Sequence, residues 1–511
     1  MPPPSCEPVA ATAAMTAAAD LAPAGSPASR VLRNGLWLAG GQAAATAASA
    51  VWLCFVPRVI GPAKMGEIAV ATSVAAILGA VVGMGIEQLL TREIARSHGW
   101  AMTGIGSGVI IRLLWWLPAV AVVALYNHLS GAGTEQAMLV WLATAAMLLS
   151  SVGGVIQAAF TGLERMHYVA CSNALSGALS RFAAIGVVMV GSGVVAMLES
   201  SLVISALVLA LNVVWMRRLF SPAWRPEARE LRSLFSRGLP LWAGGLVLTV
   251  YLWIDTLMLS ALAPAEVVGW YSVPLQIFTT LLMVAGVIGT AWYPRFSIAF
   301  THGAGALRSL ARPPVETTIL LGLLISAVIA GLSGSLILTL YGPRFHGAVG
   351  PLIVLAISVV PTYFNMLACL VLYASNRSSV WLAVVAVATV LNLGLNAVMI
   401  PWTQTHLHNG ALGAAVSLLA TEVFEAVCAL LLMPWLVDAR FVRRLARALL
   451  AAAGVAGLVT LAGRLGLAGQ LVVAIATALL LGALLRIPTR TEVAWLRALA
   501  SRRLRRAGGR P

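Results

Sequence analysis

Long apolar stretches alternate with short polar segments along almost the whole chain. Each stretch is about 20 residues long, which is the length a helix needs to cross a hydrocarbon core of about 30 Å. The pattern therefore predicts an all-α polytopic membrane protein with about 14 transmembrane helices. The predicted spans are residues 34–56, 68–90, 104–126, 137–160, 169–190, 194–215, 239–262, 267–291, 317–340, 349–373, 379–400, 411–434, 445–462 and 468–485.

One arrangement of glycine, apolar and proline positions occurs twice in the chain. In each copy a glycine opens an apolar run, which ends in a Pro-Ala turn followed by a second glycine. Many transporters are built from internal repeats, so the pattern predicts two related membrane lobes. The matching positions are Gly35 and Gly238, Pro62-Ala63 and Pro264-Ala265, and Gly66 and Gly269, the last two each 31 residues after the opening glycine (66 − 35 and 269 − 238).

The longest polar segment between predicted spans divides these two lobes. It follows the sixth span and precedes the seventh, and it is rich in arginine. The predicted division is a disordered leader at 1–29, an N-lobe with six helices at 30–215, a cytoplasmic inter-lobe loop at 216–238, a C-lobe with six helices at 239–434, two further helices at 435–485 and a basic cytoplasmic tail at 486–511.

Composition and charge support a membrane protein and exclude two other classes. The chain is 60% hydrophobic and 10% charged, with a mean hydropathy of +0.93, whereas a soluble domain has roughly 25% charged residues. The net charge of +16 first suggests a nucleic-acid partner. However, the arginines lie mostly in alternate loops and at the C-terminus, which is the positive-inside asymmetry. We therefore expect no nucleic-acid partner and place both termini in the cytoplasm.

A few ionisable residues lie inside the predicted spans, where an exposed charge costs several kcal/mol. Arg181 lies near mid-bilayer and Arg112 lies in the third span, while Asp255, Glu425 and Glu87 are the acids considered. Such residues normally face an interior cavity or each other. Arg112 has the alternative of snorkelling to the cytoplasmic surface. An ion pair of Arg181 with Asp255 or Glu425 remains open, as does a bond from Asp255 to neighbouring backbone or to Tyr251.

Uncharged polar residues recur along single faces of several spans. Their spacing of four and three residues places each set on one side of a helix. Small polar side chains commonly hold membrane helices together, which accounts for any one set. Sets in both repeats fit better with helices around a hydrated cavity. They include Gln42, Thr46 and Ser49 in the first span, Ser272, Gln276 and Thr279 in the eighth, and Ser358, Thr362 and Asn365 in the tenth.

The sequence contains no motif that indicates an enzyme or a metal centre. It has no Walker A sequence, HExxH or GxSxG. Its five cysteines are scattered without a CxxC pair, so we interpret them as packing residues. His406 and His408 share a turn, which is usually just solvated. We therefore expect a transporter without cofactor or metal.

Five segments in a fixed order resemble a known family, across about residues 33–434. The resemblance is to the polysaccharide-transport branch of the MATE-like (MOP) exporter superfamily. The segments are RVIGPAKMGEIAVATS, GMGIEQLLTREIAR, FTGLERMHYVA, IDTLMLSALAPAEVVGWYSVP and LYASNRSSVWLAVVAVATVLNLGLNAVMIP.

This resemblance implies a fold and an activity. The fold is two pseudo-symmetric six-helix lobes around a central cavity, plus two C-terminal helices. The activity is that of a Wzx-type flippase, which moves undecaprenyl-pyrophosphate-linked oligosaccharide units of O-antigen, capsule or exopolysaccharide to the outer leaflet of the bacterial inner membrane by alternating access. The implied partners are the lipid-linked oligosaccharide, membrane lipid, and polysaccharide polymerase and chain-length or export proteins.

Rival activities remain open at this stage. Related lipid II flippases have arginines in their first helix, but residues 36–55 contain no basic residue, which disfavours that activity. A MATE-type drug or ion antiporter has the same architecture. A membrane polymerase or ligase usually needs a large outer loop, and the predicted outer loops are short. The candidate substrate-binding residues are Arg181, Arg112, Arg295, Gln42, Thr46, Ser49, Gln276 and Asn365, and the candidate ion-coupling residues are Asp255, Glu425 and Glu87.

Overall fold

The computed structural model describes residues 27–97, 100–131, 133–219 and 228–484, and these residues form helices without any strand. Within these ranges, 12 helices are long and apolar enough to cross a membrane. Two of them, Gly40–Gly83 and Ala439–Leu481, each contain two predicted spans. The expectation of an all-α membrane protein with about 14 spans is therefore confirmed. Most of the predicted leader, the predicted tail and part of the inter-lobe loop lie outside the described residues.

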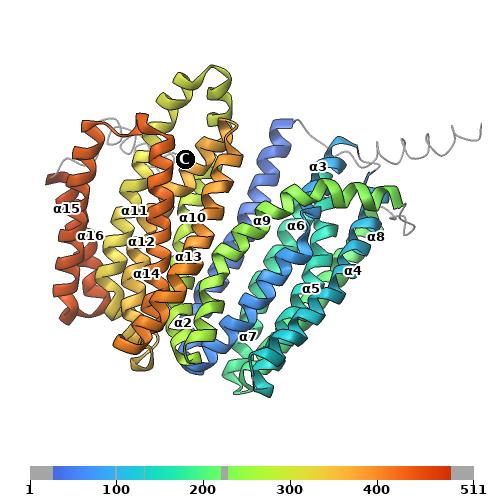
Figure 1. Cartoon of the computed structure of the whole chain (residues 1–511), viewed down its shortest axis with the longest axis horizontal. Helices are drawn as coiled ribbons and strands as arrows, with labels where there is room; N and C mark the ends of the chain where they lie inside the picture. The colour runs from blue at the N-terminus through green and yellow to red at the C-terminus, as the bar shows by residue number, and fades with distance from the viewer. Residues whose placement is uncertain (1–26, 98–99, 132, 220–227, 485–511) are drawn as a thin grey trace, which may run out of the picture. The chain divides into compact units, whose positions relative to one another are not determined.

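The chain divides into two compact units, Met1–Val273 and Pro274–Pro511. The boundary between the two units falls inside α10. The division into two lobes at 216–238 was inferred from the sequence repeats and stays a prediction. Figure 1 labels the helices. Unit 1 contains α2 (Pro27–Gly83), α3 (Ile86–Arg96), α4 (Trp100–Leu129), α5 (Thr134–Gly162), α6 (Met166–Ala174), the π-helix η1 (Leu175–Leu179), α7 (Ser180–Met189), α8 (Gly193–Leu219), α9 (Ala228–Leu262) and the first turns of α10 (Ala265–Thr301).

Unit 2 contains the rest of α10 and the helices that follow. In this unit α11 packs against α12 and α15, and α14 packs against α12 and α13. Its other elements are α11 (Ala304–Leu340), η2 (Pro343–Ala348), α12 (Val349–Ala374), α13 (Ser378–Leu407), α14 (Gly410–Leu432), η3 (Pro434–Leu436), α15 (Ala439–Leu461), η4 (Ala462–Leu465) and α16 (Gly466–Leu484).

The first two predicted spans form the single long element α2, which is kinked at Gly61. Gly61 has φ 80° and ψ 171°, a backbone conformation that is open almost only to glycine. Pro62 follows directly, and its fixed φ and missing N–H suit the first position of a new helical segment. The kink lies beside the expected Pro-Ala turn, so this position was predicted from the sequence.

The second predicted span was too long at its C-terminal end. It was expected to reach Leu90, but α2 ends at Gly83. Met84 and Gly85 have φ values of 49° and 63°, which interrupt the helix. The apolar residues that follow belong to the short helix α3, whose buried side includes Ile86 and Leu90. Glu87 therefore belongs to this separate helix and not to the second span.

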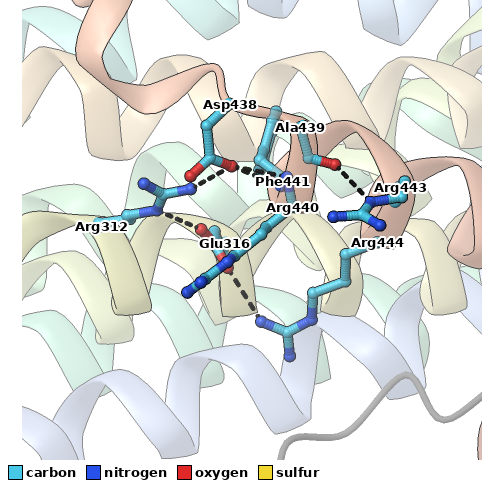
Figure 2. Close-up of polar contacts among 8 residues, drawn as sticks. All are labelled: Arg312, Glu316, Asp438, Ala439, Arg440, Phe441, Arg443 and Arg444. Carbon is cyan, nitrogen blue, oxygen red and sulfur yellow. Dashed lines mark hydrogen bonds and ion pairs between the residues drawn. The ribbon is translucent and has the colours of Figure 1, made fainter.

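An ionic cluster in unit 2 joins α11 to the segment that begins α15 (Figure 2). Arg312 Nε lies 2.7 Å from Glu316 Oε1, and Arg312 Nη2 lies 2.6 Å from Asp438 Oδ1. Arg444 Nη1 of α15 lies 3.0 Å from Glu316 Oε2. Asp438 also caps α15, because its carboxylate accepts from the backbone N–H groups of Arg440 and Phe441 at 3.0 and 2.7 Å. The cluster neutralises both arginines and holds α15 against α11.

Candidate functional site

Arg181 lies at the start of α7, directly after the π-helical turn η1. This turn interrupts the helix that was predicted as one span at 169–190. Its Gly177 packs so closely on α2 that an added Cβ would lie 2.7 Å from Cβ of Ala45. A π turn redirects the side chains that follow it and often occurs at functional sites. The turn therefore fixes the direction in which Arg181 approaches α2.

The guanidinium of Arg181 stacks on the indole of Trp52 in α2. Its Cζ lies 4.7 Å from the centre of the Trp52 ring, and Trp52 is only 3% exposed. Arg181 itself is partly buried and has neither a hydrogen-bond nor an ion-pair partner in the described part of unit 1. Stacking occupies the face of the planar guanidinium and leaves its in-plane N–H donors free to bind an anion.

The predicted polar face of the first span leads along α2 towards Trp52. Gln42 is exposed, while Thr46 and Ser49 are partly buried. The Thr46 hydroxyl donates to the backbone oxygen of Gln42 at 2.9 Å. Ser49 precedes Trp52 by three residues and so lies on the same side of the helix. The face therefore brings three candidate residues onto the helix that carries the Arg181 stack.

Arg112 pairs with Glu87 of α3. Arg112 Nη2 lies 2.8 Å from Glu87 Oε1, and the Arg112 side chain is 2% exposed. Its Nε is buried without a hydrogen-bond partner. The structure thus brings together one candidate substrate-binding residue and one candidate ion-coupling residue, and Glu87 offsets the charge of Arg112.

Asp255 in α9 forms a hydrogen bond with a tyrosine of α10. Its Oδ2 accepts a hydrogen bond from the Tyr271 hydroxyl of α10 at 3.0 Å, and both residues are buried. The sequence suggested Tyr251 or an ion pair with Arg181 for this carboxylate. Nothing in the spacing of Tyr271 indicated this contact.

Two buried acids lie together on α14 in unit 2. Glu422 and Glu425 are 5% and 4% exposed and are three residues apart, so they share one side of the helix. Asn365 of α12 donates through Nδ2 to the backbone oxygen and to Oε2 of Glu422, at 2.9 and 2.8 Å. Oε1 of Glu425 and Oδ1 of Asn365 are buried without hydrogen-bond partners. Candidate residues Asn365 and Glu425 therefore belong to one polar cluster.

The other two candidates lie in the part of α10 that belongs to unit 2. Arg295 is exposed, and its Cζ lies 5.3 Å from the centre of the Trp292 ring. Gln276 is partly buried, with Oε1 lacking a hydrogen-bond partner. Among the described residues, no group of three or more His, Cys, Asp or Glu side chains is placed to hold a metal ion.

Sequence reasoning missed Trp52 and Glu422. Trp52 continues the spacing of Gln42, Thr46 and Ser49 by one further step, which is a signal that could have identified it. Glu422 was not among the acids selected from the sequence. Its bond from Asn365 depends on the packing of α12 against α14, which the sequence alone does not specify.

Comparisons with known proteins agree on one family and one fold. A family model described as polysaccharide biosynthesis protein matches residues 31–300. A curated relative, the probable flippase AglR of Haloferax volcanii, is 25% identical over 284 residues. That match covers 53% of this chain and 56% of AglR, so the chain spans about half the length of this relative.

Solved structures show the same fold at low sequence identity. The lipid II flippase MurJ in an inward closed conformation has a TM-score of 0.71 and is 10% identical, with 89% of this chain and 98% of that chain covered. The eukaryotic MATE transporter AtDTX14 has a TM-score of 0.56 and is 14% identical, with coverage of 83% and 100%. Because the family model matches more than half of the sequence, this chain belongs to the polysaccharide biosynthesis protein family, and it has the fold of MurJ and the MATE transporters.

Proposed function

We propose that the protein is a flippase for undecaprenyl-pyrophosphate-linked oligosaccharide units of O-antigen, capsule or exopolysaccharide. It carries them from the cytoplasmic to the outer leaflet of the bacterial inner membrane by alternating access. It acts as a transporter and not as an enzyme. Family membership, the multi-pass fold and the flippase AglR among its relatives support this proposal.

The observation that carries the proposal is the unpaired arginine stacked on Trp52. A lipid pyrophosphate carries about two negative charges, and moving it into hydrocarbon without compensation costs many kcal/mol. The in-plane donors of Arg181 supply charge-assisted hydrogen bonds to phosphate oxygens. Because Trp52 holds the guanidinium by its face, Arg181 is oriented before the headgroup arrives and loses little further freedom on binding it.

The remaining candidates have distinct proposed roles. Gln42, Thr46 and Ser49 bind the sugar hydroxyls that follow the pyrophosphate. Gln276 and Asn365 are candidates for binding sugar hydroxyls within unit 2. Arg295 and Arg112 attract the headgroup electrostatically, but Arg112 acts directly only after Glu87 releases it. The isoprenoid tail stays in the surrounding lipid, because its transfer into a polar site would lose its apolar contacts.

The driving force has two proposed sources. Outward movement of two negative charges is favoured by an inside-negative potential, by roughly 4–5 kcal/mol per 100 mV. Exchange for a proton or a sodium ion adds to this if a buried carboxylate carries the cation. Glu425 is the first candidate, because its buried Oε1 has no hydrogen-bond partner. Asp255 and Glu87 are weaker candidates, because Tyr271 and Arg112 already occupy an oxygen of each.

The proposal includes a cellular setting. Both termini lie in the cytoplasm, where the arginine-rich loops belong. The flipped unit is then used by a polysaccharide polymerase and by chain-length or export proteins on the outer side. A genomic neighbourhood with glycosyltransferases and a polymerase is the expected context.

A cellular test separates this function from its rivals. The gene is deleted and complemented with wild type, Arg181→Ala or Arg464→Ala, and surface polysaccharide and protein level are measured. Arg464 is the matched control, because it is an exposed arginine in η4. We expect wild type and the control to restore polysaccharide and Arg181→Ala to fail at normal protein level. Polysaccharide that persists in the deletion strain contradicts the proposal.

The same strains identify the rival activities. An essential gene with loss of cell-wall synthesis on depletion indicates a lipid II flippase. Loss of drug resistance with normal surface polysaccharide indicates a MATE-type antiporter. Either result replaces the proposed substrate while leaving the family and the fold unchanged.

A further inference from the structure

Helices α2 and α10 touch backbone to backbone at two glycines within unit 1. A Cβ added at Gly66 would overlap the carbonyl oxygen of Ala265, and one added at Gly269 would overlap the carbonyl oxygen of Pro62. Both obstacles are backbone atoms, which cannot move aside as a flexible side chain can. The helices therefore approach this closely only because both positions are glycine.

The two glycines occupy equivalent positions of the internal repeat. Gly66 and Gly269 each follow the opening glycine of their copy by 31 residues (66 − 35 and 269 − 238). Their contacts are also reciprocal, since each glycine meets the Pro-Ala turn of the other copy. A chance close contact would not pair equivalent residues. The two copies therefore meet here through equivalent residues.

The N-terminal part of α9, far from the Pro264-Ala265 turn, packs against α2 and α3. Gly238 packs against the carbonyl oxygen of Met84, 2.6 Å from the position of an added Cβ. Trp242 Nε1 lies 3.1 Å from the carbonyl oxygens of both Ala80 and Val81. The second copy of the repeat is thus joined to the first near both ends of α9, by the Gly238 contact and the Trp242 indole at one end and by the two glycine–carbonyl contacts at the other.

We propose that the Gly66–Gly269 contact is the outer gate of the transporter, which closes when the two copies meet and separates once in each cycle. This rests on the proposed function, because an alternating-access flippase must open each end of its path in turn. The outer side is assigned from the positive-inside asymmetry, which leaves the Pro-Ala turns on the side with few arginines. A gate made of backbone closes tightly.

Alanine at either glycine tests this gate directly. Its Cβ prevents the closed contact but does not obstruct the separated state. The equilibrium should therefore shift towards the open outer end, by about tenfold. Gly40→Ala in α2 and Gly245→Ala in α9 are matched controls, because an added Cβ at either position meets nothing within 4 Å.

The shift is measured as a distance distribution between two spin labels. The labels replace Val59 and Glu266, which are exposed on the two sides of the contact, in a chain whose own cysteines are substituted. Double electron–electron resonance is recorded in lipid nanodiscs. We expect Gly66→Ala and Gly269→Ala to increase the long-distance population, while Gly40→Ala and Gly245→Ala match wild type. Unchanged distributions in both gate variants contradict the gate.

A second measurement covers the case in which the alanine variants fail to fold. Cysteines at 59 and 266 are joined by a short linker that a reductant cleaves, in a chain that keeps Gly66 and Gly269 and whose own cysteines are substituted. We expect oligosaccharide flipping to stop when the linker forms and to resume after cleavage. Flipping that continues while the linker is intact contradicts the gate.

The two proposals fail in different ways. If the gate variants shift the distances but the wild type moves no oligosaccharide, the protein has the gate but lacks the proposed function. A wild type that flips oligosaccharide, with distances that neither alanine variant changes, has the function without this gate.

Discussion

Arg237 of α9 donates to Glu93 of α3 through an Nη2–Oε1 contact of 2.6 Å. Glu93 is buried, and it also lies 3.6 Å from Arg96 Nη1 and 4.0 Å from Arg92 Nε. One buried carboxylate therefore lies within 4.0 Å of three arginine side chains where the second repeat begins to pack on the first. The Arg237–Glu93 contact lies near the contact of Trp242 with α2, and both stabilise the packing of the N-terminal part of α9.

Removing the charge of Glu93 should loosen this end of the protein. Glu93→Gln leaves three neighbouring arginines without a counter-charge. Because Arg237 is 42% exposed, solvent screens part of the loss, and we expect destabilisation by about 1–2 kcal/mol. Thermal unfolding in detergent measures it. Glu199→Gln is the control, because Glu199 is exposed on α8. Equal melting temperatures of the two variants would show that the Glu93 contacts add nothing to stability.

The pairing of Arg112 with Glu87 predicts a stability effect at an intramembrane charge. Glu87→Gln removes the counter-charge of an arginine that is 2% exposed. Breaking a fully buried pair costs about 3–5 kcal/mol, and the 45% exposure of Glu87 reduces this to about 2 kcal/mol. Unfolding in detergent again provides the measurement. A variant with wild-type stability that has lost flipping would instead assign Glu87 to ion coupling.

The stack on Trp52 predicts a graded effect on transport. Trp52→Phe keeps an aromatic face under Arg181, whereas Trp52→Leu removes the cation–π contact, which is worth about 1–2 kcal/mol when desolvated. We expect Trp52→Leu to slow flipping by about tenfold and Trp52→Phe to slow it less. The initial flipping rate at matched protein level is the readout. A larger loss in the phenylalanine variant would contradict an orienting role for the ring.

The cap of α15 predicts a pH-dependent stability. The backbone N–H of Phe441, followed by the side chain of Arg312, lowers the pKa of Asp438 below its ordinary value. A carboxyl group whose pKa is lower in the folded state stabilises the fold above its unfolded pKa of about 3.9, and this stabilisation is lost as the pH falls through the folded value. Asp438→Asn keeps a capping oxygen but removes the charge.

We therefore expect Asp438→Asn to melt below wild type at pH 7. The difference between the two melting temperatures should shrink as the pH is lowered below about 4. Thermal unfolding of both proteins across this range is the measurement. A difference that does not change with pH would mean that the charge of Asp438 does not contribute.

Hydropathy and repeat spacing predicted the fold class and the bend near Pro62. They failed at residues 84–90, where four apolar side chains continue the pattern of the second span although Met84 and Gly85 end the helix. They also underestimated the lengths of two helices. Helix α10 continues to Thr301 and helix α11 begins at Ala304, and both include polar residues that hydropathy assigns to a loop.

The site was less predictable than the fold. The sequence identified Arg181, Arg112, Glu87 and Asn365 as residues that need partners, because buried charges and amides are costly when alone. The partners come from other helices. Trp52 reaches Arg181 only through the π turn at η1, and Glu422 reaches Asn365 only through the packing of α12 on α14. These contacts depend on helix rotation and register, which one-dimensional spacing does not encode.

The most direct test of the central claim is the initial flipping rate of purified protein in proteoliposomes that contain a fluorescent undecaprenyl-pyrophosphate oligosaccharide. Wild type, Arg181→Ala and Arg181→Lys are compared with protein-free vesicles. We expect rapid flipping by wild type, an intermediate rate for Arg181→Lys because charge is kept without the planar fork, and a rate near that of empty vesicles for Arg181→Ala. Equal rates for wild type and Arg181→Ala would contradict the claim that this arginine carries the headgroup across the membrane.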